Sequence, residues 1–316
     1  MAATTRVADR VAGRAATGTY LGSGGDHRAR RGPRGFGGGK MRIVFFTGAP
    51  FAKRESFLYL YACVASRFPD VHIVAVEPRS RGGIAGGLRR QRRRLRRLGP
   101  RRFLEVVTSS PIRWILVRRD RAVVAEMLRA IPRPAIDPDP SAAVWVSTTN
   151  GSEAVDAISR LEPDVVIQVG AGILRRRIFE IARLDTLAIR YGIAPLIGGL
   201  SSIDWALWER RWEWIGATIH TIDERSATGS VLAYAPVERK RAGEGFPGLY
   251  VRSTKKAVAA LLEVLERLER GERWSIDPPA GPRAHRSAFS GWKHLALELR
   301  HFAERRATPP RDPDPP

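Results

Sequence analysis

Cysteine, long apolar runs and acidic residues are all scarce in this chain. Cys63 is the only cysteine among 316 residues, so an internal disulfide and a cysteine-based metal site are excluded. Because the surrounding stretch 57–65 is apolar, we expect a buried, unreactive thiol in a reducing compartment. No apolar run approaches the roughly 18 residues of a membrane-spanning helix, and the chain does not open on a charged-then-apolar signal sequence. We therefore expect a cytoplasmic protein without a membrane span.

Acidic residues number 32 against 54 lysines and arginines, which gives a net charge of +22. The basic stretch Arg79–Arg102 contains no acidic residue and carries leucines at near-helical spacing. A basic helix of this kind binds nucleic acid, a membrane surface or an acidic partner. A solvated insertion helix that packs through its leucines has the same pattern, and a GC-rich genome also produces an arginine-rich chain. The charge alone does not decide between these interpretations.

Patterning predicts one α/β domain over residues 41–235. Apolar strands alternate there with helices, which indicates a mostly parallel sheet covered by helices on both faces. A hydrophobic content of 43% is ordinary for a globular protein and allows a sizeable core. The strands are predicted at 43–46, 71–76, 144–146 and 164–170, and the helices at 53–67 and 152–161.

Extensions flank this domain on both sides. Residues 1–40 are rich in glycine and arginine without an apolar period, and we expect them to be disordered. Met41 would then be the true start of the protein. Residues 236–306 are predicted to form a helical extension, with one helix from about residue 254 to Gly271 and another over 290–306. The proline-rich residues 307–316 are predicted to be a disordered tail.

Tryptophans crowd one short segment of the predicted domain. Trp205, Trp208 and Trp212 recur at spacings of three and four, which predicts one face of a helix. Such a face packs in the core or forms a self-association surface.

Two segments carry the chemistry-bearing patterns. Residues 216–232 form a strand with His220, an acidic turn at Asp223 and a Thr-Gly step that leads into another apolar strand. Residues 188–199 form a strand that runs through a glycine and a proline into a Gly-Gly pair, and a helix follows.

These segments resemble the two motifs of the formyltransferase family, the folate-dependent enzymes that include methionyl-tRNA, glycinamide-ribotide and sugar-amine formyltransferases. The second family motif reads Gly-x-Thr-x-His, Asp-Glu and Asp-Thr-Gly, and this chain keeps all of it except that Ala227 replaces the aspartate. The first family motif begins Asn-x-His. Here Ala188 and Arg190 occupy those two positions, while the later proline and glycines are kept.

The resemblance implies formyl transfer from 10-formyltetrahydrofolate to an amine. In the family, Asn stabilises the oxyanion, His handles the proton and Asp orients the His. Arg190 can donate hydrogen bonds, but it stays charged and cannot accept a proton. Catalysis would therefore rely on Arg190 together with the relocated groups His220 and Asp223. The alternatives are a satisfied strand histidine at 220 and a solvated turn at 223. By the same resemblance the donor would contact Thr47, Gly48, Pro195, Gly199, Thr228 and Gly229.

The sequence thus predicts a Rossmann-like formyltransferase fold with a helical C-terminal extension. The predicted function is formyl transfer to a small-molecule amine, with an amino sugar as the more natural acceptor. A tRNA acceptor usually requires a C-terminal β-domain, which is not found after residue 235, but the basic stretch Arg79–Arg102 keeps tRNA open. The alternative is a catalytically inactive binding or interaction protein, since the positions of the family triad hold Ala188, Arg190 and Ala227.

Overall fold

The computed structural model describes residues 40–78, 92, 95–96, 99–223, 229–238, 244–279, 281, 283–286 and 289–307. Several expectations lie outside these residues. They concern the N-terminal extension before Lys40, the C-terminal tail after Ala307, most of the basic stretch Arg79–Arg102, and the motif positions Ala227 and Thr228.

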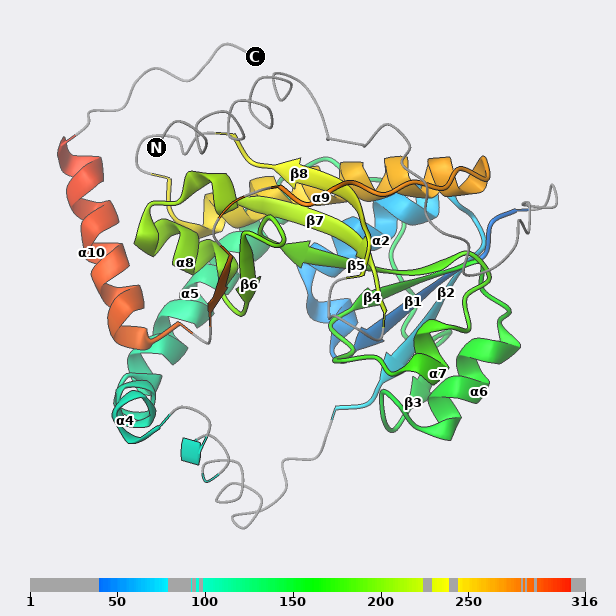
Figure 1. The fold of residues 1–316 in the computed structure, drawn as a ribbon, viewed down its shortest axis with the longest axis horizontal. Coiled ribbons are helices and arrows are strands. Elements are labelled where there is room, and N and C mark those ends of the chain that lie inside the picture. Colours follow the sequence, from blue (N-terminus) through cyan, green and yellow to red (C-terminus); the bar gives the residue numbers. More distant parts are fainter. Residues whose placement is uncertain are drawn as a thin grey trace.

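The core of the fold is a seven-stranded sheet with the strand order β3-β2-β1-β4-β5-β7-β8 (Figure 1). The strands β1 to β5 run parallel to one another, whereas β7 runs antiparallel to both β5 and β8. The mostly parallel sheet that the sequence predicts is therefore confirmed. The strand bounds are β1 Ile43–Gly48, β2 Val71–Val76, β3 Val144–Val146, β4 Val165–Val169, β5 Asp185–Tyr191, β7 Gly216–Thr221 and β8 Val231–Pro236.

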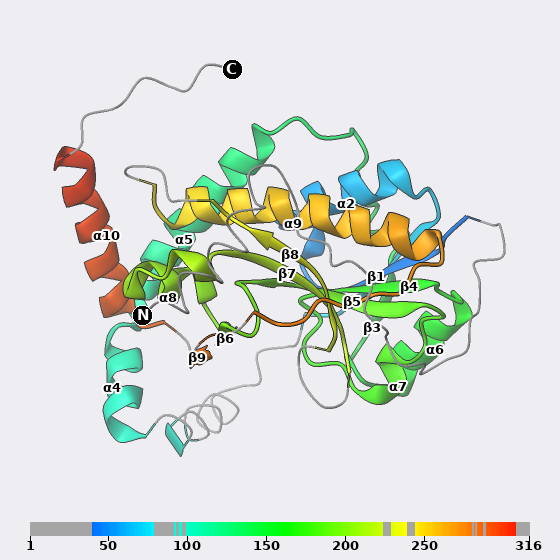
Figure 2. The same ribbon diagram turned by 45° about the horizontal axis from the view of Figure 1, so that its top comes forward.

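Helices cover both faces of this sheet because its central strands are apolar on both sides (Figure 2). Ile43 and Phe45 point to the face covered by α2 (Glu55–Arg67) and α9 (Phe246–Glu269). Val44 and Phe46 point to the opposite face, under α6 (Ser152–Arg160) and α7 (Arg176–Phe179). The alternation follows from the two-residue period of a strand. None of the described helices combines the length and the apolar character needed to cross a bilayer.

Cys63 lies on α2 at the edge of this core and is partly exposed, so the expected full burial of its thiol is wrong. Burial still raises the pKa of the thiol, with the Tyr59 hydroxyl and Arg133 acting in the opposite direction. A raised pKa keeps the group protonated and unreactive at neutral pH.

The C-terminal part of the chain packs closely onto the sheet. α9 lies along β7 and β8. After α9 the chain passes along β8, where the amide of Ile276 donates to the carbonyl of Val231 at 2.9 Å. A short strand β9 (Ala284–Arg286) then pairs with β6 (Ile197–Gly199). The predicted boundary at residue 235 stays a prediction.

Three further helices lie at one side of the molecule, outside the sheet (Figure 1). They are α4 (Pro100–Thr108), α5 (Ser110–Arg129) and α10 (Gly291–Ala307), and α10 packs against both α5 and α8 (Ser202–Glu209). α10 matches the helix predicted over 290–306. No helix was predicted from the sequence at the position of α5.

The prediction of one tryptophan face over Trp205, Trp208 and Trp212 is only partly right. The rings of Trp205 and Trp208 both meet Phe289 edge-on, at 5.0 and 6.0 Å between centroids. Trp212 lies beyond the helix, because Arg210 adopts a left-handed conformation (φ 54°) that ends α8 at Glu209. The paired tryptophans therefore belong to the core between α8 and the segment before α10.

Candidate functional site

A cavity of about 1650 Å³ opens at the carboxyl ends of the parallel strands. Its walls come from the loops after β1 and β4, the second half of β5, the end of β7 and the start of α8. Open α/β sheets commonly bind their ligands at this edge. The cavity brings together all three residues predicted to be catalytic, Arg190, His220 and Asp223.

The ladder between β5 and β7 positions the polar groups. Ala188 lies directly opposite His220, and Arg190 lies opposite Thr218. Ala188 and Arg190 are two residues apart on one strand and therefore project from the same face of the sheet. The register between β7 and β8 shifts at Ile219/His220. The histidine thus sits at an irregularity of the sheet, a place where a bulge can re-aim a side chain.

His220 is held in a neutral form. Its Nδ1 lies 2.8 Å from the carbonyl oxygen of Thr221, and since a carbonyl only accepts, Nδ1 carries the hydrogen. Burial lowers the pKa of His220, and the nearby Arg190 lowers it further, while the bond to Thr221 and the charge of Asp223 oppose the shift. At neutral pH the imidazole therefore keeps a lone pair on Nε2, which can accept a proton.

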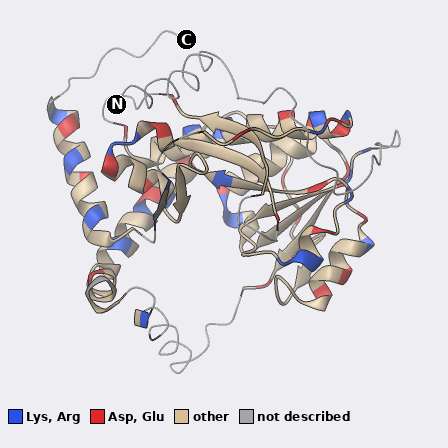
Figure 3. Cartoon of the chain, viewed as in Figure 1, with Lys and Arg blue, Asp and Glu red and all other residues tan. Residues whose placement is uncertain are grey.

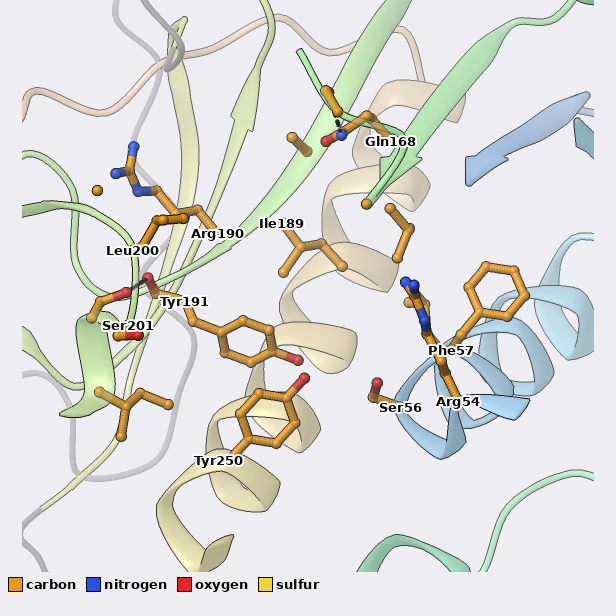
Figure 4. Close-up of a pocket in the computed structure, with 18 of the residues that line it drawn as sticks. Arg54, Ser56, Phe57, Gln168, Ile189, Arg190, Tyr191, Leu200, Ser201 and Tyr250 are labelled. Carbon is orange, nitrogen blue, oxygen red and sulfur yellow. Dashed lines mark hydrogen bonds between the residues drawn. The ribbon is translucent and has the colours of Figure 1, made fainter. Parts of the chain in front are cut away.

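Arg190 lies partly buried in the cavity, beside Leu200 (Figure 4). Burial lowers the pKa of its guanidinium. Within the part of the chain that the structure describes, Arg190 has no hydrogen-bond or ion-pair partner. A half-buried guanidinium without a counter-ion is costly, and an oxyanion or anionic ligand group in the cavity would satisfy it.

The residues predicted to bind the folate donor divide into those that line the cavity and those that lie behind its wall. Gly199 lines the cavity next to Leu200. Thr47 is fully buried and donates to the carbonyl of Val169 at 2.9 Å, so it links β1 to β4 behind the cavity wall. Gly48 packs on the backbone of Gly170, where a Cβ atom would come within 2.9 Å of the carbonyl oxygen.

The two remaining described positions lie away from the cavity wall. Pro195 follows a cis peptide bond before β6. Gly229 approaches the backbone of Thr221 so closely that a Cβ atom would lie 2.6 Å from its carbonyl oxygen. They shape the backbone that carries Gly199 and His220.

The structure adds cavity residues that the sequence reading missed. Tyr191 and Tyr250 stack with ring centroids 4.6 Å apart, and the Tyr191 hydroxyl bonds to that of Thr254 at 2.9 Å (Figure 4). Arg54 comes from the loop before α2, and its guanidinium lies against Gly170. Tyr191 could have been found, because it directly follows Arg190 in the first motif. Tyr250 lies on the first turns of α9, which begins eight residues earlier than predicted.

No family model matches the chain. Over 119 residues the chain is 34% identical to methionyl-tRNA formyltransferases of Legionella pneumophila strains Paris and Philadelphia 1. This stretch is 37% of the chain and 37% of either relative, so the match spans little more than a third of the relatives' length.

Among solved structures, a 4-N formyltransferase from Francisella tularensis is 15% identical, with a TM-score of 0.47 over 79% of this chain and 77% of that one. Glycinamide ribonucleotide transformylase 1 from Symbiobacterium toebii is 16% identical, with a TM-score of 0.43 over 79% of this chain and 94% of that one. These structural likenesses are too loose to inform on the site or the substrate.

The sequence match and the observed sheet together define the class of the protein. It has an α/β fold of the formyltransferase type and is a distant homologue of the methionyl-tRNA formyltransferases. The predicted fold and family resemblance are thus confirmed.

Proposed function

We propose that this protein transfers a formyl group from a folate donor to an amine, with Arg190 and His220 as its catalytic groups. The observation that carries the proposal is a neutral histidine in the same cavity as a guanidinium that no described residue pairs with. Acyl transfer to an amine requires these two capabilities, since negative charge develops on the carbonyl oxygen while the amine loses a proton.

The cavity fits the donor, 10-formyltetrahydrofolate, which supplies the formyl group when bound. Its volume of about 1650 Å³ accommodates a folate together with an acceptor. Apolar and aromatic side chains such as Ile189, Tyr191 and Leu200 line it and would pack against the pterin ring. The basic residues Arg54 and Arg175 line the same cavity and would attract the carboxylates of the folate tail.

Each catalytic group has a defined task in this proposal. Arg190 donates hydrogen bonds to the carbonyl oxygen as negative charge builds up on it. His220 accepts the proton of the attacking amine at Nε2, while Nδ1–H stays bonded to Thr221 and fixes the ring. Asp223 stabilises the imidazolium that results, because its negative charge raises the pKa of His220.

The acceptor is a small-molecule amine in this proposal, and an amino sugar is its most natural form. A tRNA acceptor would use the basic stretch Arg79–Arg102, most of which lies outside the described residues. We infer a cytoplasmic location for the protein.

A second function is favoured by one observation. Ala188 supplies no oxyanion donor at the position where the family has an asparagine, and its side chain is almost completely buried opposite His220. A protein that has lost this donor can serve as a folate-free binding or interaction module. The two functions differ in their need for folate.

Calorimetric binding of 5-formyltetrahydrofolate, a stable isomer of the donor, to the full chain separates the two functions. Micromolar binding that Arg190→Met weakens about tenfold supports the transferase, since one charge-assisted hydrogen bond is worth about 1.5–3 kcal/mol. Arg160→Met, at an exposed position on α6, is the matched control and should bind like the original chain. Absence of binding, with the fold intact by circular dichroism, rejects the transferase and leaves the interaction module.

A further inference from the structure

The helix α10 turns its more apolar side to solvent, which is the reverse of an ordinary surface helix. Two of the side chains that it buries are histidines, His294 and His301, each 4% exposed. Among its side chains that the structure describes, the fully exposed ones are apolar with the exception of Arg306. A surface helix normally packs its apolar stripe on the core and leaves its polar residues in water. The arrangement of α10 is typical of a helix whose exposed side is covered by a partner.

The exposed residues of α10 form one continuous stripe. Trp292, Ala296, Leu299 and Ala303 follow one another at spacings of four, three and four, so they share one face of the helix. Phe302 lies at the edge of this stripe. Trp292 is 48% exposed, Leu299 61% and Phe302 55%. We call this surface the α10 face (Trp292, Ala296, Leu299, Phe302 and Ala303).

The helix α4 extends the α10 face at its N-terminal end. Nε1 of Trp292 lies 3.5 Å from Oγ1 of Thr108. Leu104, one turn earlier on the same side of α4, is 62% exposed. In both views α4 and α10 form the outer border of the molecule, and no described element lies beyond them (Figure 1 and Figure 2). A contiguous apolar patch of this kind marks a site of interaction with a protein or a membrane.

The charge at the edge of the α10 face is positive. Charged residues of both signs occur along α10 (Figure 3), but they differ in exposure. Glu298 accepts a hydrogen bond from Arg119 at 2.5 Å and is only partly exposed, as is Glu304. Arg306 is exposed, and its guanidinium lies 4.4 Å from the centre of the Phe302 ring. A cation is thus held directly beside an exposed aromatic side chain.

The segments next to α10 carry positive charge as well. On α4 and α5, Glu126 is the only acidic residue among the fully exposed charged side chains that the structure describes. The others are arginines, namely Arg118, Arg119, Arg121 and Arg129. Ahead of α4, Arg92 and Arg96 are exposed and belong to the basic stretch Arg79–Arg102, which contains no acidic residue. This side of the molecule therefore favours a partner with negative charge.

We propose that the α10 face docks on the surface of an anionic lipid bilayer. Exposed tryptophan, leucine and phenylalanine side chains enter the boundary between lipid headgroups and acyl chains, while arginines pair with the lipid phosphates. The contact holds the protein at a membrane without a spanning helix.

Two other occupants fit the α10 face less well. A second copy of this chain would bring two surfaces with arginines of the same sign together, and each copy carries a net charge of +22. A nucleic acid offers phosphates to the arginines, but it has no hydrocarbon layer in which Leu299 and Phe302 could be buried. An anionic bilayer satisfies both the apolar and the basic part of the surface.

The test is co-sedimentation of the full chain with vesicles of phosphatidylglycerol and phosphatidylcholine, compared with phosphatidylcholine alone. We expect binding to the mixed vesicles and about tenfold weaker binding to the neutral ones. Leu299→Ser combined with Phe302→Ser should weaken binding to the mixed vesicles about tenfold or more. Arg306→Gln should weaken it about fivefold, the usual contribution of one basic residue near an anionic surface. Met127→Ser, at a position on α5 that is 38% exposed, is the matched control and should bind like the original chain.

Quenching by lipids that are brominated in their acyl chains gives a second readout. Fluorescence of the original chain should decrease on binding, and Trp292→Phe should lose most of that decrease. The proposal is overturned if the original chain, folded by circular dichroism, does not bind the anionic vesicles. It is also overturned if the Leu299/Phe302 double variant binds as tightly as the original chain. A dimer that dissociates in this double variant, seen by analytical ultracentrifugation, would assign the α10 face to a second copy instead. None of these results bears on the folate proposal, which has its own binding assay.

Discussion

Ala188 and His220 face each other across the ladder between β5 and β7. The family motif places an asparagine amide where this chain has the methyl group of Ala188. The residue directly opposite on the neighbouring strand carries an imidazole that is neutral and hydrogen-bonded at Nδ1. The loss of polar groups from β5 therefore coincides with a histidine on β7 that is suited to accept a proton.

His220→Gln should reduce the rate of formyl transfer by about 10²–10⁴, the usual contribution of a positioned general base. Glutamine can still occupy the space on β7, but its amide does not take up a proton. Steady-state kinetics with an amine acceptor measure the effect. The loss should appear in kcat, with binding of 5-formyltetrahydrofolate nearly unchanged.

His72→Gln is the matched control for this variant. His72 is a partly exposed histidine on β2 that pairs with Asp70 at 2.8 Å, away from the cavity. Its replacement should leave kcat as it is. Equal losses in both variants, or an unchanged rate in His220→Gln, would show that His220 is only a satisfied strand residue.

Two substitutions should shift the pKa of His220 in opposite directions. Arg190 lowers this pKa and Asp223 raises it, in addition to the lowering by burial. Arg190→Gln should therefore raise the pKa, and Asp223→Asn should lower it. Titration of the labelled imidazole by NMR measures both shifts without any assay of activity. Shifts of the same sign, or none, would mean that these side chains do not share one electrostatic site.

Much of the fold could be predicted because a buried strand is recognised from the apolar pattern of its own residues. The strand predicted at 43–46 corresponds to β1, and those at 71–76 and 144–146 match β2 and β3. Their continuous apolar character reflects burial on both faces, which is a property of each strand alone. The placement of Arg190 and His220 in one cavity also followed, since both positions belong to motifs with a defined place in the fold.

The sequence could not reveal α5 or the pairing of Asp120 with His294. The buried positions of α5 are Asp120, Val124 and Leu128, so a charged residue interrupts the apolar period by which a helix is found. Asp120 is buried because it meets His294, which lies 174 residues away in the sequence. No local pattern encodes a pairing at that distance. The same holds for the stack of Tyr191 on Tyr250.

Asp185→Asn should stabilise the protein at neutral pH. Burial raises the pKa of Asp185 to about 6, although Arg273 partly opposes the shift. Its ionised form is thus less favourable in the folded than in the unfolded chain, whose carboxyl pKa is about 3.9. Stability is therefore lost as the pH rises from about 4 to 6, and the uncharged asparagine avoids this loss.

The expected gain for Asp185→Asn is up to about 3 kcal/mol above pH 7, shrinking towards zero near pH 4. Urea unfolding at several pH values measures it. Asp156→Asn, at an exposed position, should change stability little at any pH. A destabilised Asp185→Asn at pH 7 would indicate that the carboxylate is favourably paired in the folded protein.

Trp274→Phe should destabilise the fold through a single hydrogen bond. Trp274 is 1% exposed, and its Nε1 donates to the carbonyl of Leu232 on β8 at 2.7 Å. The guanidinium of Arg267 lies 3.9 Å from the centre of its ring. Phenylalanine keeps much of the apolar contact but leaves the buried carbonyl without its donor, at a cost of about 1–3 kcal/mol.

Because the segment from Trp274 to Ile276 lies along β8, the loss should open this edge of the sheet first. Hydrogen exchange should therefore show reduced protection in β8, while β1 and β4 in the middle of the sheet keep theirs, and Trp292→Phe at a half-exposed position should change neither. Uniform loss of protection across the sheet would contradict a local role for this tryptophan.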